Sequence, residues 1–111
     1  MGYFTKNTRI LIIDTETTNS SANMDDVLVY DCGFAVCDIY GNVYETASYV
    51  IHDIFYKEPE LMQSAYFASK IPRYKQDIIE RKRFVVTIYQ LRELIFEIIK
   101  RYNIKYCAAY N

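Results

Sequence analysis

The chain has 111 residues, the size of one domain, so residues 1–111 are treated as part of a single domain. Hydrophobic residues make up 51% and charged residues 24%, which is too apolar a composition for a disordered chain. With 13 basic and 14 acidic residues the net charge is −1, which excludes a strongly basic protein that coats nucleic acid non-specifically.

Three long strands are predicted in the first half of the chain, and together they form an antiparallel meander. The first has four consecutive aliphatic residues between polar ones, typical of a central strand buried on both faces. The second is nearly all apolar, and the third alternates between apolar and polar residues. A turn with Gly41 or Asn42 at positive φ joins the second strand to the third. The strands are predicted at 9–14, 27–37 and 43–51.

Three helices and a fourth strand are predicted in the second half. Pro59 and Pro72 suit the first turns of two short helices. Thr87 and Gln90 fit the capping box of a longer helix with an apolar stripe at helical spacing. Because a helical crossover lets the fourth strand lie parallel to the first and beside it, we expect an α/β fold with a mixed sheet. These elements are predicted at 59–69, 72–81, 87–103 and 104–110.

The cysteines Cys32, Cys37 and Cys107 are expected to be buried, reduced thiols. They are odd in number, lie in apolar surroundings and form no Cys-x-x-Cys pair or Cys/His cluster, which argues against zinc. The N-terminus lacks a signal-peptide pattern, and no apolar run approaches the roughly 18 residues of a membrane span. We therefore expect a soluble, cytoplasmic protein that does not enter a membrane.

The sequence Asp14-Thr15-Glu16 at the end of the first strand is the main candidate site. Residues two apart in a strand point to the same side, so both carboxylates would share one patch about 6–7 Å apart. Each raises the pKa of the other, and a divalent cation removes this repulsion. Hard oxygen ligands suit Mg²⁺ or Mn²⁺. The alternative is a solvated strand end whose two acids only begin the next loop.

Residues 10–18, Ile-Leu-Ile-Ile-Asp-Thr-Glu-Thr-Thr, resemble the first motif of the DEDD superfamily of 3′–5′ exonucleases. These enzymes are related to the epsilon proofreading subunit of DNA polymerase III and have a ribonuclease H-like fold. Asp31-Cys32-Gly33 lies where relatives carry Glu-Ile-Gly, and 38–42 matches their hairpin turn. Ala109-Tyr110-Asn111 resembles the start of the second motif, and 62–74 resembles a phage-encoded branch. The resemblance spans nearly the whole chain.

The resemblance implies a two-metal mechanism, in which four acidic residues bind two Mg²⁺ or Mn²⁺ ions. Phosphodiester bonds of DNA or RNA would be hydrolysed from the 3′ end of a single strand, one nucleotide at a time. Asp14 and Glu16 match the first two acids and are the expected catalytic and metal-binding residues. Thr15, Thr17 and Asn111 are the expected substrate-binding residues. A DNA polymerase or other replication proteins are the partners that the resemblance implies, in the host cytoplasm for a phage protein.

The match to the family is incomplete. The second-motif acid, and the third motif with its final Asp and its His or Tyr base, would follow Asn111. We therefore expect residues 1–111 to be the N-terminal part of the exonuclease domain, nearly inactive by themselves. The fourth strand would then be a bare sheet edge, so self-association is expected. His52 does not match the base and is expected to be an ordinary surface residue. Four acids on predicted helices match no motif: Asp77, Glu80, Glu93 and Glu97.

The near-neutral net charge hides an asymmetry along the chain. Residues 1–55 hold two basic and eight acidic side chains, whereas 56–111 hold eleven basic and six acidic ones. This indicates either a metal–carboxylate site beside an anion-binding surface or a chance split of solvated charges. For the basic cluster, a solvated helix face is favoured over contact with a substrate backbone. The cluster consists of Lys70, Arg73, Lys75, Arg81, Lys82 and Arg83.

Two other function classes stay open. The first is a non-catalytic module, in which a truncated nuclease scaffold binds nucleic acid or a protein partner. The second is a nucleotide-sugar transferase, in which Asp-x-Glu holds a metal and a diphosphate. The three-strand meander that precedes any helix speaks against the usual α/β arrangement of such transferases.

Overall fold

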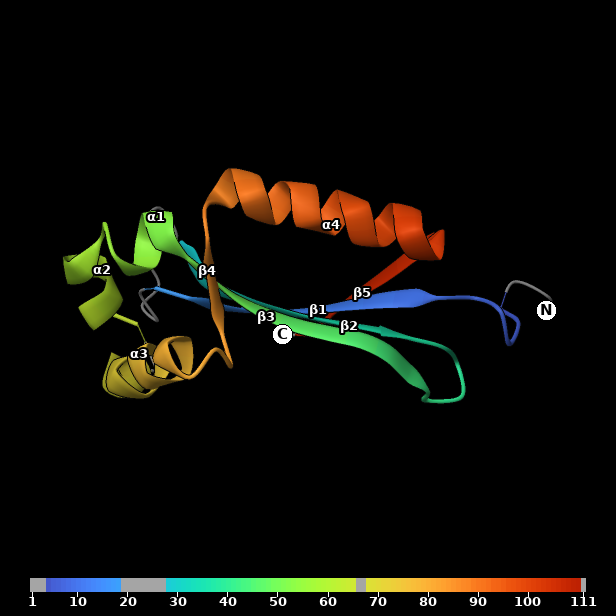
Figure 1. The fold of residues 1–111 in the computed structure, drawn as a ribbon, viewed down its shortest axis with the longest axis horizontal. Helices are drawn as coiled ribbons and strands as arrows, with labels where there is room; N and C mark the ends of the chain where they lie inside the picture. The colour runs from blue at the N-terminus through green and yellow to red at the C-terminus, as the bar shows by residue number, and fades with distance from the viewer. Residues whose placement is uncertain (1–3, 19–27, 66–67, 111) are drawn as a thin grey trace.

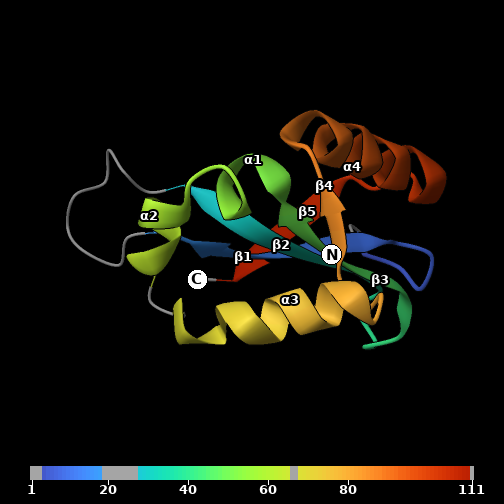
Figure 2. The ribbon, with the colours of Figure 1, turned by 60° about the vertical axis from the view of Figure 1, so that its left-hand side comes forward.

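Five strands form one mixed sheet with helices on both faces, as the computed structural model shows for residues 4–18, 28–65 and 68–110 (Figure 1). The sheet order is β4-β3-β2-β1-β5. The long helix α4 covers one face, and α3 lies against the other (Figure 2). The strands are β1 (Ile10–Thr17), β2 (Val29–Cys37), β3 (Val43–Ile51), β4 (Phe84–Val86) and β5 (Tyr106–Tyr110). The helices are α1 (His52–Phe55), α2 (Pro59–Gln63), α3 (Ile71–Ile79), α4 (Ile88–Tyr102) and the 3₁₀ helix Ala68–Lys70.

The predicted α/β fold with a mixed sheet is confirmed. Strands β1, β2 and β3 pair antiparallel in chain order, as the meander requires. Strand β5 pairs parallel with β1, from Ile10 opposite Tyr106 to Asp14 opposite Tyr110, which is the predicted position of the fourth strand. Strand β4, parallel to β3 at the other edge, was not predicted, because a run of three residues carries too little pattern. Self-association through the β5 edge stays a prediction.

Helix α4 is the element that the sequence predicts best. The hydroxyl of Thr87 accepts from the backbone N–H of Gln90 at 3.1 Å, and the Gln90 side chain accepts from the backbone N–H of Thr87 at 2.8 Å. The helix ends where Asn103 takes a left-handed conformation. The two shorter helices end earlier than predicted. Helix α2 stops at Gln63, and α3 stops before Arg81, whose φ of 61° reverses the chain.

The main core lies between the sheet and α4. Leu11 of β1 is 0% exposed and belongs to a cluster with Phe34 and Val36 of β2 and with Leu91 and Ile98 of α4. A second core packs α1, α2 and α3 against the other end of the sheet, and its buried members are Tyr30, Val50, Phe55, Met62, Ala65 and Tyr74.

Two predictions about burial are wrong. Strand β1 is not buried on both faces, because Ile12, on the face opposite Leu11, is 37% exposed. Cys107 is exposed because β5 is an edge strand, whereas Cys32 and Cys37 are buried as predicted, and all three are free thiols. In the described parts of the chain, no helix has the length and apolar character needed to cross a membrane.

The turn between β2 and β3 is organised by the carboxylate of Asp38. This carboxylate accepts from the backbone N–H groups of Tyr40 and Asn42 at 2.9 and 3.0 Å, and from the Tyr44 hydroxyl at 2.6 Å. The Asn42 amide donates to it as well, at 2.8 Å. Gly41 takes the positive φ, 85°, that the turn needs. The hydrogen bonds from Tyr44 and Asn42 hold the pKa of Asp38 well below its usual range.

We expect Asp38→Asn to lower the melting temperature at pH 7, because the amide cannot replace the charged acceptor. A carboxylate whose pKa is lowered in the folded state stabilises the protein above the unfolded-state pKa of about 4. This stabilisation decreases as the pH falls from about 4 towards the folded-state pKa. Thermal melts of both proteins between pH 7 and pH 2.5 measure the difference, which should narrow below about pH 4. A difference of the same size at both ends of this range would contradict the prediction.

Candidate functional site

The polar face of the sheet lies beneath α3. In the register of β1 and β2, Glu16 is opposite Asp31 and Asp14 is opposite Gly33. Gly33 is in turn opposite Ser48 of β3. Directly paired residues point to the same side of a sheet, so all five face α3. The prediction that Asp14 and Glu16 share one side of the strand is therefore confirmed.

These five residues form one side of a pocket of about 580 Å³, which we call the α3 pocket. Asp14 and Glu16 are its acidic wall. Helix α3 and its flanking residues form the other side, and the basic groups there are Lys70, Arg73 and Arg83. Tyr74 and Asp77 of α3 complete the lining. The pocket thus brings carboxylates from the acidic half of the chain next to cations from the basic half.

Arg83 is held in the pocket by contacts with three elements. Its Nη1 donates to Asp31 Oδ1 at 3.0 Å and to the hydroxyl of Ser48 at 3.1 Å. Its Nε donates to Asp77 Oδ2 at 3.2 Å. The guanidinium also lies over the ring of Tyr74, 4.1 Å from the centroid. The turn after α3 places it there, because the backbone N–H of Arg83 donates to the carbonyl of Asp77 at 3.2 Å.

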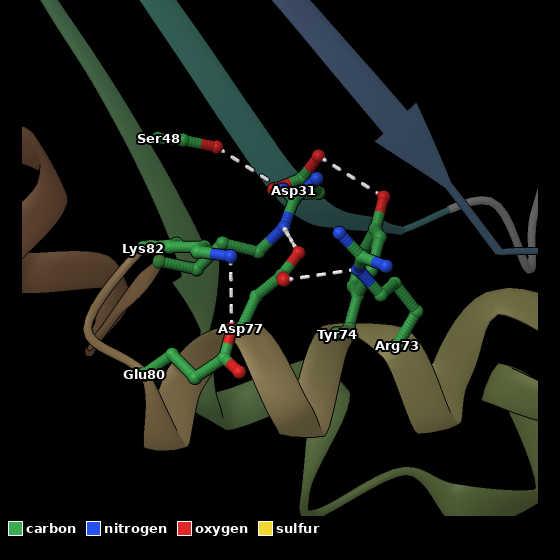
Figure 3. A network of polar contacts seen from close by, with 8 residues as sticks. Asp31, Ser48, Arg73, Tyr74, Asp77, Glu80 and Lys82 are labelled. Carbon is green, nitrogen blue, oxygen red and sulfur yellow. Dashed lines mark hydrogen bonds and ion pairs between the residues drawn. The ribbon is translucent and has the colours of Figure 1, made fainter.

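Asp31 and Asp77 are buried acids that each have two side-chain partners (Figure 3). The Tyr74 hydroxyl donates to Asp31 at 3.3 Å, and Arg73 donates to Asp77 at 3.1 Å. Burial raises the pKa of Asp31 above its ordinary value, although Arg83 and Tyr74 oppose this shift. Both acids are therefore satisfied within the protein, which a buried carboxylate requires.

The surroundings of Glu16 raise the pKa of its carboxyl group above the ordinary value. Its pKa is raised first by partial burial and then by the negative charges of Asp14 and Asp31, while Lys70 and Arg83 act in the opposite direction. Asp14 itself is exposed to solvent within β1. The two carboxylates of the acidic wall are thus close enough to repel each other, and a bound cation would relieve this repulsion.

The acidic wall supplies two carboxylates, those of Asp14 and Glu16, and carboxylate oxygens are the donors that a hard divalent cation takes. Among the residues that the structure describes, no group of three or more His, Cys, Asp or Glu side chains is arranged to hold a metal. Mg²⁺ is commonly bound through only one or two carboxylates and takes its other oxygens from water and substrate phosphates. Such an ion suits the donor set.

Two of the predicted substrate-binding residues, Thr15 and Thr17, do not line the α3 pocket. Thr15 alternates to the opposite face of β1, where it pairs with Cys32, and Thr17 follows an irregularity in the β1–β2 register. Neither belongs to the pocket lining. Asn111 lies outside the described residues. His52 is half-buried at the start of α1, where its ring lies 5.5 Å from that of Tyr56.

Arg83, Asp77 and Asp31 are among the pocket residues that were not predicted as site residues from the sequence. Arg83 was assigned to a solvated basic face, but its side chain is only 23% exposed. Asp77 was set aside as a helix acid, yet it is buried between two arginines. Asp31 carried a usable signal: a charged residue inside a nearly apolar strand must find a partner. Arg81, Lys82 and Lys75 are exposed, as the solvated reading expects.

Comparisons with models of protein families, with curated proteins and with solved structures found no match for this chain.

Proposed function

We propose that the protein is a metal-dependent 3′–5′ exonuclease of DNA or RNA, with Asp14 and Glu16 as its first two metal ligands. One observation carries this proposal: two adjacent carboxylates face a pocket whose other side carries basic groups. A divalent cation needs the first feature and a phosphodiester the second. The mixed sheet, with its antiparallel meander and parallel β5, also supports the ribonuclease H-like fold that the sequence resemblance implies.

The residues of the pocket have distinct roles in this proposal. Asp14 and Glu16 hold Mg²⁺ or Mn²⁺, which supplies activation of water and stabilisation of the leaving oxygen when bound. Arg73 meets the phosphate backbone, because its side chain remains 72% exposed while its Nε donates to Asp77. The resemblance requires two further acids and a general base beyond those assigned here. Residues 1–111 should therefore bind metal and single strands but cleave poorly.

Metal binding tests the acidic wall directly. We expect Asp14→Asn and Glu16→Gln each to weaken Mn²⁺ binding by about tenfold or more, because each removes one of two charged ligands. Titration of free Mn²⁺ by electron paramagnetic resonance gives the affinity of each protein. Glu93→Gln is the matched control, since Glu93 is exposed on α4, which packs on the opposite face of the sheet.

The outcomes separate the proposed function from its alternatives. Wild-type affinity for Mn²⁺ in both acidic-wall variants would contradict the proposal. A binding assay with a labelled single-stranded oligonucleotide then distinguishes a non-catalytic binding module from a nucleotide-sugar transferase. Oligonucleotide binding that needs neither metal nor Asp14 would favour the non-catalytic module. For a longer chain that also supplies the missing ligands, Asp14→Asn should abolish 3′–5′ digestion in Mg²⁺.

A further inference from the structure

A third carboxylate faces the same pocket as the acidic wall, but its oxygens are already engaged. Asp31 lies directly opposite Glu16 in the sheet. Its Oδ1 accepts from Arg83 at 3.0 Å, and its Oδ2 accepts from the Tyr74 hydroxyl at 3.3 Å. The residue is only 8% exposed. By position Asp31 is a candidate third ligand of the metal, but each of its two oxygens already accepts a hydrogen bond from a neighbouring side chain.

Several contacts hold the side chain of Arg83 in one position. Besides Asp31, it is bonded to Ser48 and Asp77, and its guanidinium is stacked on Tyr74. A planar guanidinium with several donors satisfied is held in one orientation, which a lysine ammonium would not be. The bond to Asp31 therefore belongs to a network that fixes the orientation of Arg83.

Arg83 also contributes to the net charge of the pocket. Four carboxylates and three basic groups leave one net negative charge, and a bound divalent cation would turn it into one net positive charge. That sign attracts a phosphodiester. Without Arg83, the empty pocket would carry two negative charges and the metal-loaded pocket none.

We propose that Arg83 is a positioning residue that withholds Asp31 from the metal, so that the metal binds at Asp14 and Glu16 and the loaded pocket stays positive for a phosphate. The inference rests on the proposed function and deepens it. It predicts that Arg83 lowers the affinity of the pocket for metal and raises its affinity for nucleic acid. A residue that served only to hold α3 against the sheet would affect both affinities in the same direction.

Arg83→Gln is the direct test, with Mn²⁺ and a labelled single-stranded oligonucleotide in saturating Mg²⁺ as the two probes. We expect Mn²⁺ to bind roughly threefold to tenfold more tightly, because one positive charge is lost and Asp31 is released. The oligonucleotide should bind several-fold more weakly, at roughly the loss of one phosphate-attracting charge. In Asp31→Asn/Arg83→Gln the gain for Mn²⁺ should vanish. Arg92→Gln removes the same charge from an exposed position on α4, on the opposite face of the sheet, and both affinities should stay within about twofold.

Asp31→Asn alone tests the inference even if Arg83→Gln does not fold, which thermal melts will show. A carboxylate that is withheld contributes little, so Mn²⁺ affinity should stay within about threefold of wild type. A loss as large as that of Asp14→Asn would make Asp31 a ligand and overturn the inference, while the proposed function would stand. Unchanged or weaker Mn²⁺ binding in folded Arg83→Gln would also overturn it. If the proposed function is wrong, the affinity for Mn²⁺ will instead be unchanged in both Asp14→Asn and Glu16→Gln.

Discussion

Replacing Leu11 by alanine is expected to destabilise the protein by about 3–4 kcal/mol, the largest effect on stability that we predict. Leu11 is fully buried beneath α4, on a strand with neighbours on both sides. In the sheet it is flanked by Val36 on β2 and Cys107 on β5. Truncation leaves a cavity that these paired strands cannot close. The loss is a large part of the stability of a small domain at the lower end of the usual range of about 5–15 kcal/mol. Urea unfolding, followed by circular dichroism, measures it.

The neighbouring residue supplies a matched control. Ile12 lies on the same strand but faces the other side of the sheet, where it is 37% exposed. We expect Ile12→Ala to cost about 1 kcal/mol or less. Equal losses for the two variants would contradict the assignment of the α4 face as the main core. The comparison also tests which face of β1 carries Asp14 and Glu16, because Ile12 lies on the same face of the strand as these two residues.

Substituting valine for Gly33 is expected to abolish most oligonucleotide binding in Mg²⁺ while leaving the fold intact. Gly33 lines the α3 pocket between Asp14 and Ser48. A Cβ added there would lie 3.8 Å from the carbonyl of Asp14 and 3.9 Å from that of Ala47, which are ordinary contacts. The strand therefore accepts a side chain, and a glycine in a strand interior costs roughly 0.5–1 kcal/mol relative to alanine. The valine methyl groups then project into the space of the ligand.

Opposite effects on stability and binding make this second prediction specific. A clash that costs about 1.4 kcal/mol weakens binding about tenfold, and we expect at least this loss by fluorescence anisotropy. Thermal stability should stay equal or rise slightly. Ala35→Val is the control, because Ala35 lies two residues along the same face of β2 but outside the pocket lining. Wild-type affinity in Gly33→Val would show that the ligand binds elsewhere.

The parts of the fold that depend on local pattern were predictable from the sequence. Alternation and turn residues determine the meander, and positive φ was predicted for either Gly41 or Asn42; the structure shows it at Gly41. The capping box at Thr87 begins α4 through contacts three residues apart. Within the site, the shared orientation of Asp14 and Glu16 follows from strand geometry alone.

What could not be predicted depends on distant contacts. Arg83 and Asp31 are 52 positions apart, and no local pattern pairs a basic residue after one helix with an acid inside an earlier strand. The solvated reading of Arg83 failed because the turn at Arg81 folds the chain back over Asp77. Similarly, the apolar run of β1 indicated two buried faces. The actual burial of Ile12 depends on how far α3 extends over the sheet, which the strand sequence does not encode.

The three thiols differ in exposure, so their rates of alkylation can be used to measure local unfolding of the sheet. Cys107 is exposed on an edge strand, so an alkylating reagent should modify it quickly in the native state. Cys32 lies next to Asp31 on β2, and burial raises the pKa of its thiol to about 11, so it should react only when the strand opens. With Cys107 blocked first, the alkylation rate of Cys32 measures how often the central sheet beneath the pocket unfolds. A cation that binds at Asp14 and Glu16 should slow that rate in proportion to its occupancy, which yields an affinity without any catalytic assay.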